Sequence, residues 1–235
     1  DLTVSVDAIL ECLSPRTKLI FLANPNNPTG TMIPRGDIEK LIAQVPDHVV
    51  IVLDSAYAEY LDGADADYTD GAEYVDKHDN VVMLRTFSKI FGLGALRLGW
   101  GYFPDAIYAM LATIRGAFSV NAAAAIAGAA AISDKAFYQQ SIAHNNKWMP
   151  LIQASIRQAG FNPLPSQANF FLIRFASPDA ASHAHAYLAE RNILLRKMVP
   201  YGLPDCLRMS IGTDAEMEQL AAAFKDMAHM KDIHP

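Results

Sequence analysis

The stretch Val81–Gly101 reads VVMLRTFSKIFGLGALRLGWG, and it decides the fold class. It opens with a short apolar run, Val81–Leu84, which is typical of a buried strand. Arg85-Thr86-Phe87-Ser88-Lys89 follows directly, and Gly99–Phe103 predicts a further strand. Polar residues placed just after a buried strand are typical of α/β sheets, whose ligands bind at the carboxyl ends of the strands.

The same pattern recurs upstream. Apolar runs at 18–23 (KLIFLA) and 49–53 (VVIVL) predict two more buried strands, which end at Asn24-Pro25 and at Asp54. Residues 34–44 have helical periodicity with a proline at the start, and 104–114 predicts another helix. Continuous apolar strands that alternate with helices predict an α/β domain with a mainly parallel sheet covered on both faces.

The second half of the chain predicts a smaller α+β domain. Residues 134–160 predict one long helix, with a possible break at Pro150. We therefore assign residues 1–150 to the C-terminal part of a large domain and 151–235 to a small C-terminal domain. The elements predicted for the small domain are a strand at 169–175, a helix at 178–191, short strands near 194–196 and 207–211, and a helix from Asp214.

Composition limits the class of protein. The chain has 235 residues, of which 51% are hydrophobic, and this suffices for a sizeable core. A net charge of −6 without a basic run argues against nucleic acid or an anionic membrane as the main partner. Two cysteines without metal-ligand spacing predict no zinc site and no disulfide framework. Residues 116–132 are alanine-rich and predict a buried helix, and 62–70 predicts a solvated acidic loop. No leader pattern opens the chain, so we expect a cytoplasmic protein.

Four segments at or after strand ends carry the chemistry: Asn24–Gly30 (NPNNPTG), Asp54–Tyr57 (DSAY), Thr86–Lys89 (TFSK) and Arg97. Taken singly, they indicate a turn, a helix cap, a strand end and a surface arginine. Taken together, they supply an amine for a Schiff base, an acid for a pyridinium nitrogen, a phenol and an amide for a ring oxygen, and hydroxyls with an arginine for a phosphate. Pyridoxal 5′-phosphate requires this set of groups.

With these motifs the chain resembles fold-type I aminotransferases, and within them the histidinol-phosphate aminotransferases. The motifs NPNNPTG, D-x-A-Y, S-K-x-F-G-L…R-L-G-W and the later Leu207–Thr213 (LRMSIGT) carry this resemblance over essentially the whole chain. The resemblance implies that Lys89 forms the Schiff base and moves the α-proton of the substrate. It also implies that Asp54 pairs with the pyridine N–H. The remaining cofactor contacts that it implies are Tyr57 and Asn27 to the ring oxygen, and Thr86, Ser88 and Arg97 to the phosphate.

Two further arginines are implied for the substrates. Arg208 matches the residue that holds the carboxylate of the glutamate and 2-oxoglutarate pair, and Arg196 would contact the phosphate of histidinol phosphate. Both are predicted on adjacent short strands, which could direct them toward one pocket. On residue type alone, Arg196 is more often a surface strand arginine.

The resemblance implies transamination between L-histidinol phosphate and 2-oxoglutarate in a homodimer. Three alternatives stay open: an aromatic amino acid aminotransferase, a threonine-phosphate decarboxylase of the same fold, and a non-catalytic interaction module. Such aminotransferases carry a further N-terminal part, so we expect either a longer whole protein or a remnant poor in cofactor. Ser55 is a small departure, because many relatives have glutamate there.

Overall fold

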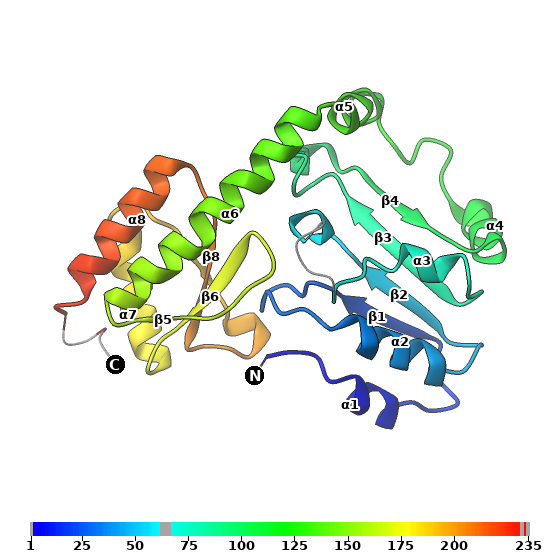
Figure 1. The fold of residues 1–235 in the computed structure, drawn as a ribbon, viewed down its shortest axis with the longest axis horizontal. Helices are drawn as coiled ribbons and strands as arrows, with labels where there is room; N and C mark the ends of the chain where they lie inside the picture. The colour runs from blue at the N-terminus through cyan, green and yellow to red at the C-terminus, as the bar shows by residue number, and fades with distance from the viewer. Residues whose placement is uncertain (1, 62–66, 231–232, 234–235) are drawn as a thin grey trace. The chain divides into compact units, whose positions relative to one another are not determined.

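The computed structural model describes residues 2–61, 67–230 and 233, which form two compact units (Figure 1). Unit 1 comprises Asp1–Asn26 and Thr31–Ser141, and unit 2 comprises Asn27–Gly30 and Ile142–Pro235. The chain passes from unit 1 to unit 2 within a helix, α6 (Lys135–Gln158), which continues through Pro150. The division into domains at residue 150 stays a prediction.

Unit 1 contains a four-stranded sheet in the order β1 (Leu19–Ala23), β2 (Val50–Asp54), β3 (Val81–Thr86) and β4 (Gly99–Tyr102) (Figure 1). The first three strands are parallel, and β4 is antiparallel to β3. This arrangement confirms the predicted α/β class with a mainly parallel sheet. β2 and β3 bury successive side chains on both faces, whereas β1 at the end of the sheet order leaves Leu19 54% and Phe21 71% exposed.

The carboxyl ends of the parallel strands lie in register. Ala23 pairs with Asp54, and Asp54 pairs with Leu84. The Asn24 amide donates to the Asp54 carbonyl at 3.0 Å, and the Ser55 amide donates to the Leu84 carbonyl at 2.9 Å. The residues that follow β1, β2 and β3 therefore begin at one edge of the sheet.

One face of this sheet carries the core of unit 1. Side chains alternate along a strand, and Ile20, Leu22 and Met83 belong to the face that is buried. Helix α2 (Arg35–Gln44) contributes a stripe with the spacing of an amphipathic helix: Ile38, Leu41 and Ile42. The other helices that add to this core are α1 (Val6–Glu11) and α3 (Ala72–Val75).

The alanine-rich stretch is a helix, but the burial predicted for it is wrong. Helix α5 (Ala122–Ser133) begins where the Asn121 side chain accepts from the Ala124 amide at 2.8 Å. Only Ala124 and Gly128 are buried among its residues, because the helix packs along a single stripe of small side chains. The preceding Phe118 is 97% exposed. The remaining elements of unit 1 are η1 (Ala58–Tyr60), η2 (Gly94–Leu96) and α4 (Asp105–Ile114).

Unit 2 has an antiparallel sheet in the order β5 (Asn162–Pro163), β6 (Phe170–Arg174), β8 (Cys206–Ser210) and β7 (Arg196–Lys197). Its core joins the sheet to the helices through buried apolar side chains: Ile152 and Ile156 of α6, Ala184 and Leu188 of α7 (Pro178–Ala189), Leu220 and Phe224 of α8 (Asp214–Met227), and Phe171, Ile173, Leu207 and Met209 of the strands. A short 3-10 helix, η3 (Val199–Tyr201), connects β7 to β8. This arrangement matches the predicted α+β pattern.

Within the described part of the chain, no helix combines the length and the apolar character needed to cross a membrane.

Candidate active site

The end of β2 presents Asp54 and Tyr57. Asp54 is exposed, and its Oδ1 accepts from the Ala56 amide at 3.2 Å. The neighbouring Ser55 is buried, because successive side chains of a strand point to opposite faces. Tyr57 is 4% exposed, so its ring is fixed by packing. The segment thus offers an accessible carboxylate beside a buried phenol ring.

The end of β3 brings Lys89 to Tyr57. The Lys89 Nζ lies 5.1 Å from the centroid of the Tyr57 ring. At this distance an ammonium is attracted by the negative face of the ring. Two residues that the sequence analysis assigned to the same site are therefore adjacent in unit 1, although they come from different strands.

Hydroxyl groups and an arginine surround this lysine along the chain. The Thr86 Oγ1 accepts from the Ser88 amide at 3.0 Å, which shapes the turn before Lys89. Arg97 donates to the Ser88 Oγ at 3.4 Å and to the Gly94 carbonyl at 2.7 Å. Arg97 has a φ of 57°, a left-handed conformation that costs a residue other than glycine roughly 1–3 kcal/mol. In this conformation Arg97 ends the 3-10 helix η2.

Unit 2 places the two predicted substrate arginines opposite each other. Arg196 of β7 pairs with Arg208 of β8, which confirms that they lie on adjacent strands. The Arg208 Nη1 donates to the Asn27 Oδ1 at 2.5 Å, and its guanidinium lies 4.8 Å from the Phe170 ring centroid. Arg196 is exposed and donates to the Tyr201 hydroxyl at 3.1 Å. A cavity of about 380 Å³ within unit 2 is lined by both arginines.

Unit 1 also contains a group of charged side chains that the sequence did not indicate. Arg85 forms ion pairs with Glu59 at 3.2 Å and with Asp70 at 3.0 Å. The predicted solvated acidic loop holds only in part for residues 67–70: Asp67 is exposed and Asp70 is half-buried, whereas Tyr68 is 9% exposed and Thr69 is 6% exposed. Residues 62–66 of that loop lie outside the described residues. Tyr68 and Thr69, which interrupt the acidic run, are the sequence signal that could have indicated burial here.

No group of three or more histidine, cysteine, aspartate or glutamate side chains that could hold a metal ion occurs within residues 2–61, 67–230 and 233. Lysine, hydroxyl, carboxylate and guanidinium groups are the polar side chains of the candidate site instead.

Residues 1–224 match the family described as Aminotransferase class I and II. The chain belongs to this family. A histidinol-phosphate aminotransferase from Granulibacter bethesdensis is 46% identical over 224 residues, which are 95% of this chain and 60% of that protein. One from Hyphomonas neptunium is 44% identical, with 96% and 61% covered. The chain spans about three fifths of the length of these curated relatives.

The fold agrees with the family assignment. The crystal structure of histidinol-phosphate aminotransferase from Sinorhizobium meliloti in complex with pyridoxal-5′-phosphate superimposes with a TM-score of 0.84 at 28% identity. The match covers 95% of this chain and 61% of that chain.

Proposed function

We propose that this chain is the greater part of an aminotransferase that uses pyridoxal 5′-phosphate to exchange an amino group between L-histidinol phosphate and 2-oxoglutarate. The observation that carries the proposal is the position of the Lys89 Nζ, 5.1 Å from the Tyr57 ring, at the edge of the sheet where β2 and β3 end. Names of relatives at 44–46% identity support the choice of substrate.

The side chains of unit 1 fit the cofactor. Lys89 offers a primary amine for covalent attachment, and the exposed carboxylate of Asp54 can accept a hydrogen bond from the N–H of a protonated pyridine ring. The contact between Arg97 and Ser88 groups a guanidinium with a hydroxyl, which suits a phosphate. When bound, the cofactor supplies an electron sink for negative charge on the substrate Cα.

The protein residues would then manage protons and position. The Lys89 Nζ would take the proton from the substrate Cα and return it on the other side of the exchange. The Asp54 carboxylate would keep the ring nitrogen protonated by its charge. The Tyr57 hydroxyl and the Asn27 amide would hold the ring oxygen, with Thr86 adding to the phosphate contacts.

The cavity of unit 2 favours substrates with two anionic groups. Arg208 is partly buried between the Phe170 ring and Asn27, so its guanidinium is preorganised for a carboxylate. Arg196 stands across from it and is free to turn, because its own partner is the exposed Tyr201. One fixed and one adaptable cation can serve a substrate carboxylate and a substrate phosphate in turn.

The test has two parts, made on the protein at its natural full length. Incubation with pyridoxal 5′-phosphate, borohydride reduction and peptide mapping should place a pyridoxyl group on Lys89. Incubation with L-histidinol phosphate and 2-oxoglutarate should yield glutamate.

A label on Lys40 or Lys147 would remove Lys89 from its role. Carbon dioxide released from threonine phosphate, or glutamate formed only with aromatic amino acids, would replace the proposed substrate. Absence of cofactor binding would indicate a non-catalytic module.

We also propose a cytoplasmic homodimer. The exposed apolar side chains of α5, Ile126 at 75% and Ile132 at 51%, support a protein contact on this helix, since small alanines allow close approach. Sedimentation at micromolar concentration should give twice the monomer mass, and a strict monomer with full activity would contradict this.

A further inference from the structure

A short segment of unit 1 reaches the ends of all three parallel strands. We name it the strand-end clamp, and it consists of Tyr68, Thr69 and Asp70. The Tyr68 hydroxyl donates to the carbonyl of Asn24 at 3.0 Å, just after β1. The Asp70 carbonyl accepts from the Ser55 Oγ at 2.7 Å, just after β2.

The third contact of the clamp is made to β3. The Asp70 Oδ2 accepts from the Arg85 Nη2 at 3.0 Å, and Glu59 binds the same guanidinium at 3.2 Å. The Arg85 side chain is 18% exposed and the Glu59 side chain is 8% exposed. Charges with so little solvent are strongly coupled, so loss of one partner leaves the others poorly compensated. Arg85 is thereby held in one position at the end of β3.

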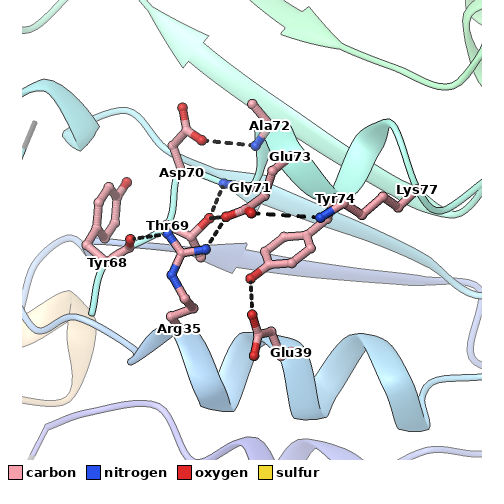
Figure 2. Close-up of polar contacts among 10 residues, drawn as sticks. All are labelled: Arg35, Glu39, Tyr68, Thr69, Asp70, Gly71, Ala72, Glu73, Tyr74 and Lys77. Atoms are coloured by element: carbon pink, nitrogen blue, oxygen red, sulfur yellow. Dashed lines mark hydrogen bonds and ion pairs between the residues drawn. The ribbon is translucent and has the colours of Figure 1, made fainter. Parts of the chain in front are cut away.

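Side chains of α2 and α3 contact the clamp, as Figure 2 shows. The Arg35 Nη2 donates to the Tyr68 carbonyl at 3.0 Å, and Arg35 also forms an ion pair with Glu73. The Thr69 Oγ1 donates to the same Glu73 carboxylate at 3.2 Å. Burial raises the pKa of the Tyr68 phenol, so this hydroxyl keeps its proton and remains a donor.

Two of the three clamp contacts lie next to a candidate cofactor residue. Ser55 follows Asp54 directly, and Arg85 precedes Thr86 directly. Because neighbouring side chains of a strand point to opposite faces, the clamp grips one side chain of each pair and leaves the other available. A small shift of Ser55 or Arg85 would therefore displace a group proposed to contact the cofactor.

We propose that Asp70 is a positioning residue for the cofactor site, acting through Ser55 and Arg85 to fix Asp54 and Thr86, and that Tyr68 supports it by holding the chain after β1 through the Asn24 carbonyl. This inference rests on the proposed function. The clamp would then determine the geometry of the cofactor site in addition to stabilising the fold. Displacements of about 1 Å at a catalytic group can lower turnover about 100-fold, which sets the scale of the expected effect.

The test uses two conservative variants in the full-length protein. Asp70→Asn keeps the size of the side chain and removes its charge, and Tyr68→Phe removes only the hydroxyl. Asp79→Asn is the matched control, because Asp79 is an exposed carboxylate of unit 1 outside the clamp. Asp70→Asn should lower kcat about 10- to 100-fold and weaken cofactor binding, and Tyr68→Phe should do so less. The KM for 2-oxoglutarate should stay within about twofold, since Arg196 and Arg208 are untouched.

Two readouts separate positioning from stability. The circular dichroism of the bound cofactor should change in both clamp variants. Hydrogen exchange in cofactor-free protein should quicken at the amides of 55–57 and 86–89, but not in Asp79→Asn. A lower Tm with unchanged exchange, cofactor affinity and kcat in both variants would overturn the clamp proposal alone. A wild-type protein that binds no pyridoxal 5′-phosphate would overturn the proposed function together with it.

Discussion

The two units place their candidate residues in different ways. In unit 1 Asp54 is the last residue of β2, whereas Tyr57 and Lys89 follow the strands and depend on turns for their final positions. In unit 2, Arg196 and Arg208 lie within strands, and the backbone ladder sets them opposite each other. The backbone hydrogen bonds of the sheet fix the position of a residue within a strand. A residue that follows a strand must instead be held by side-chain contacts. The difference explains why unit 1 contains a buried charged network at its strand ends.

The largest effect is expected at Lys89. Lys89→Arg keeps a cation near the Tyr57 ring but removes the amine that can lose its proton, so turnover should fall by at least about 1000-fold. Steady-state assays of glutamate formation would measure this. Lys77→Arg is the matched control, because Lys77 lies 5.9 Å from the Tyr74 ring in the same unit. Retained turnover in Lys89→Arg would remove the strand-end lysine from the chemistry.

A smaller loss is expected at Asp54. Asp54→Asn should still bind the cofactor but lose about 100- to 1000-fold in kcat, because a neutral amide cannot hold the pyridine proton by charge. Absorbance titration with the cofactor and turnover assays would separate the two properties. Asp47→Asn provides an exposed carboxylate before β2 as a control. If Asp54→Asn turned over at the wild-type rate, its carboxylate would be only the local acceptor of the Ala56 amide.

The two strand arginines of unit 2 should differ in their effects on the two substrates. Arg196→Ala should raise the KM for histidinol phosphate about 10- to 100-fold, the value of one lost charge-assisted hydrogen bond, and leave that for glutamate almost unchanged. Arg208→Ala should impair both half-reactions. Lys197→Ala, a neighbouring exposed cation of β7, is the control. Equal small effects of Arg196→Ala on both substrates would favour an amino donor without a phosphate.

A modest change in stability should be confined to unit 2. The Thr213 side chain and Glu216 form a capping box at the start of α8. Thr213→Ala should lower the free energy of unfolding by about 1 kcal/mol. In a Trp100→Phe background, Trp148 is the tryptophan left to report on unit 2 during denaturant unfolding. Thr113→Ala in α4 is the control, and an equal loss there would contradict a role of the capping box.

The smallest expected effect is a pH dependence at the same helix start. Hydrogen bonds from Lys147, then from Trp148, lower the pKa of Asp214. A carboxylate with a lowered folded pKa stabilises the fold above its ordinary pKa, and this contribution is lost as the pH falls through the folded value. The free energy of unfolding of the wild-type protein should therefore fall on acidification, and it should fall less in Asp214→Asn. Identical slopes of stability against pH in both proteins would contradict this.

Much of the fold could be predicted from the sequence because its signals are local. The apolar runs at 18–23, 49–53 and 81–84 begin within one residue of the first residues of β1, β2 and β3. Burial of α5 was predicted wrongly, because an alanine-rich run does not reveal which of its faces meets a partner. Lys89 and Tyr57 could be grouped because both follow buried strands, but no local pattern gives the distance between them, which the structure sets at 5.1 Å from Nζ to the ring centroid.

The sequence by itself determined the strands, the helices and the residue types at the strand ends, because side-chain periodicity and turn chemistry act over a few neighbouring residues. Only the tertiary structure decided which distant groups meet. Tyr68 reaches the carbonyl of Asn24 across 44 positions, and Arg208 reaches Asn27 across 181. The segment before Gly71 reaches β3 because Arg85 offers the half-buried Asp70 a countercharge. Such contacts depend on packing between segments, and no local pattern encodes them.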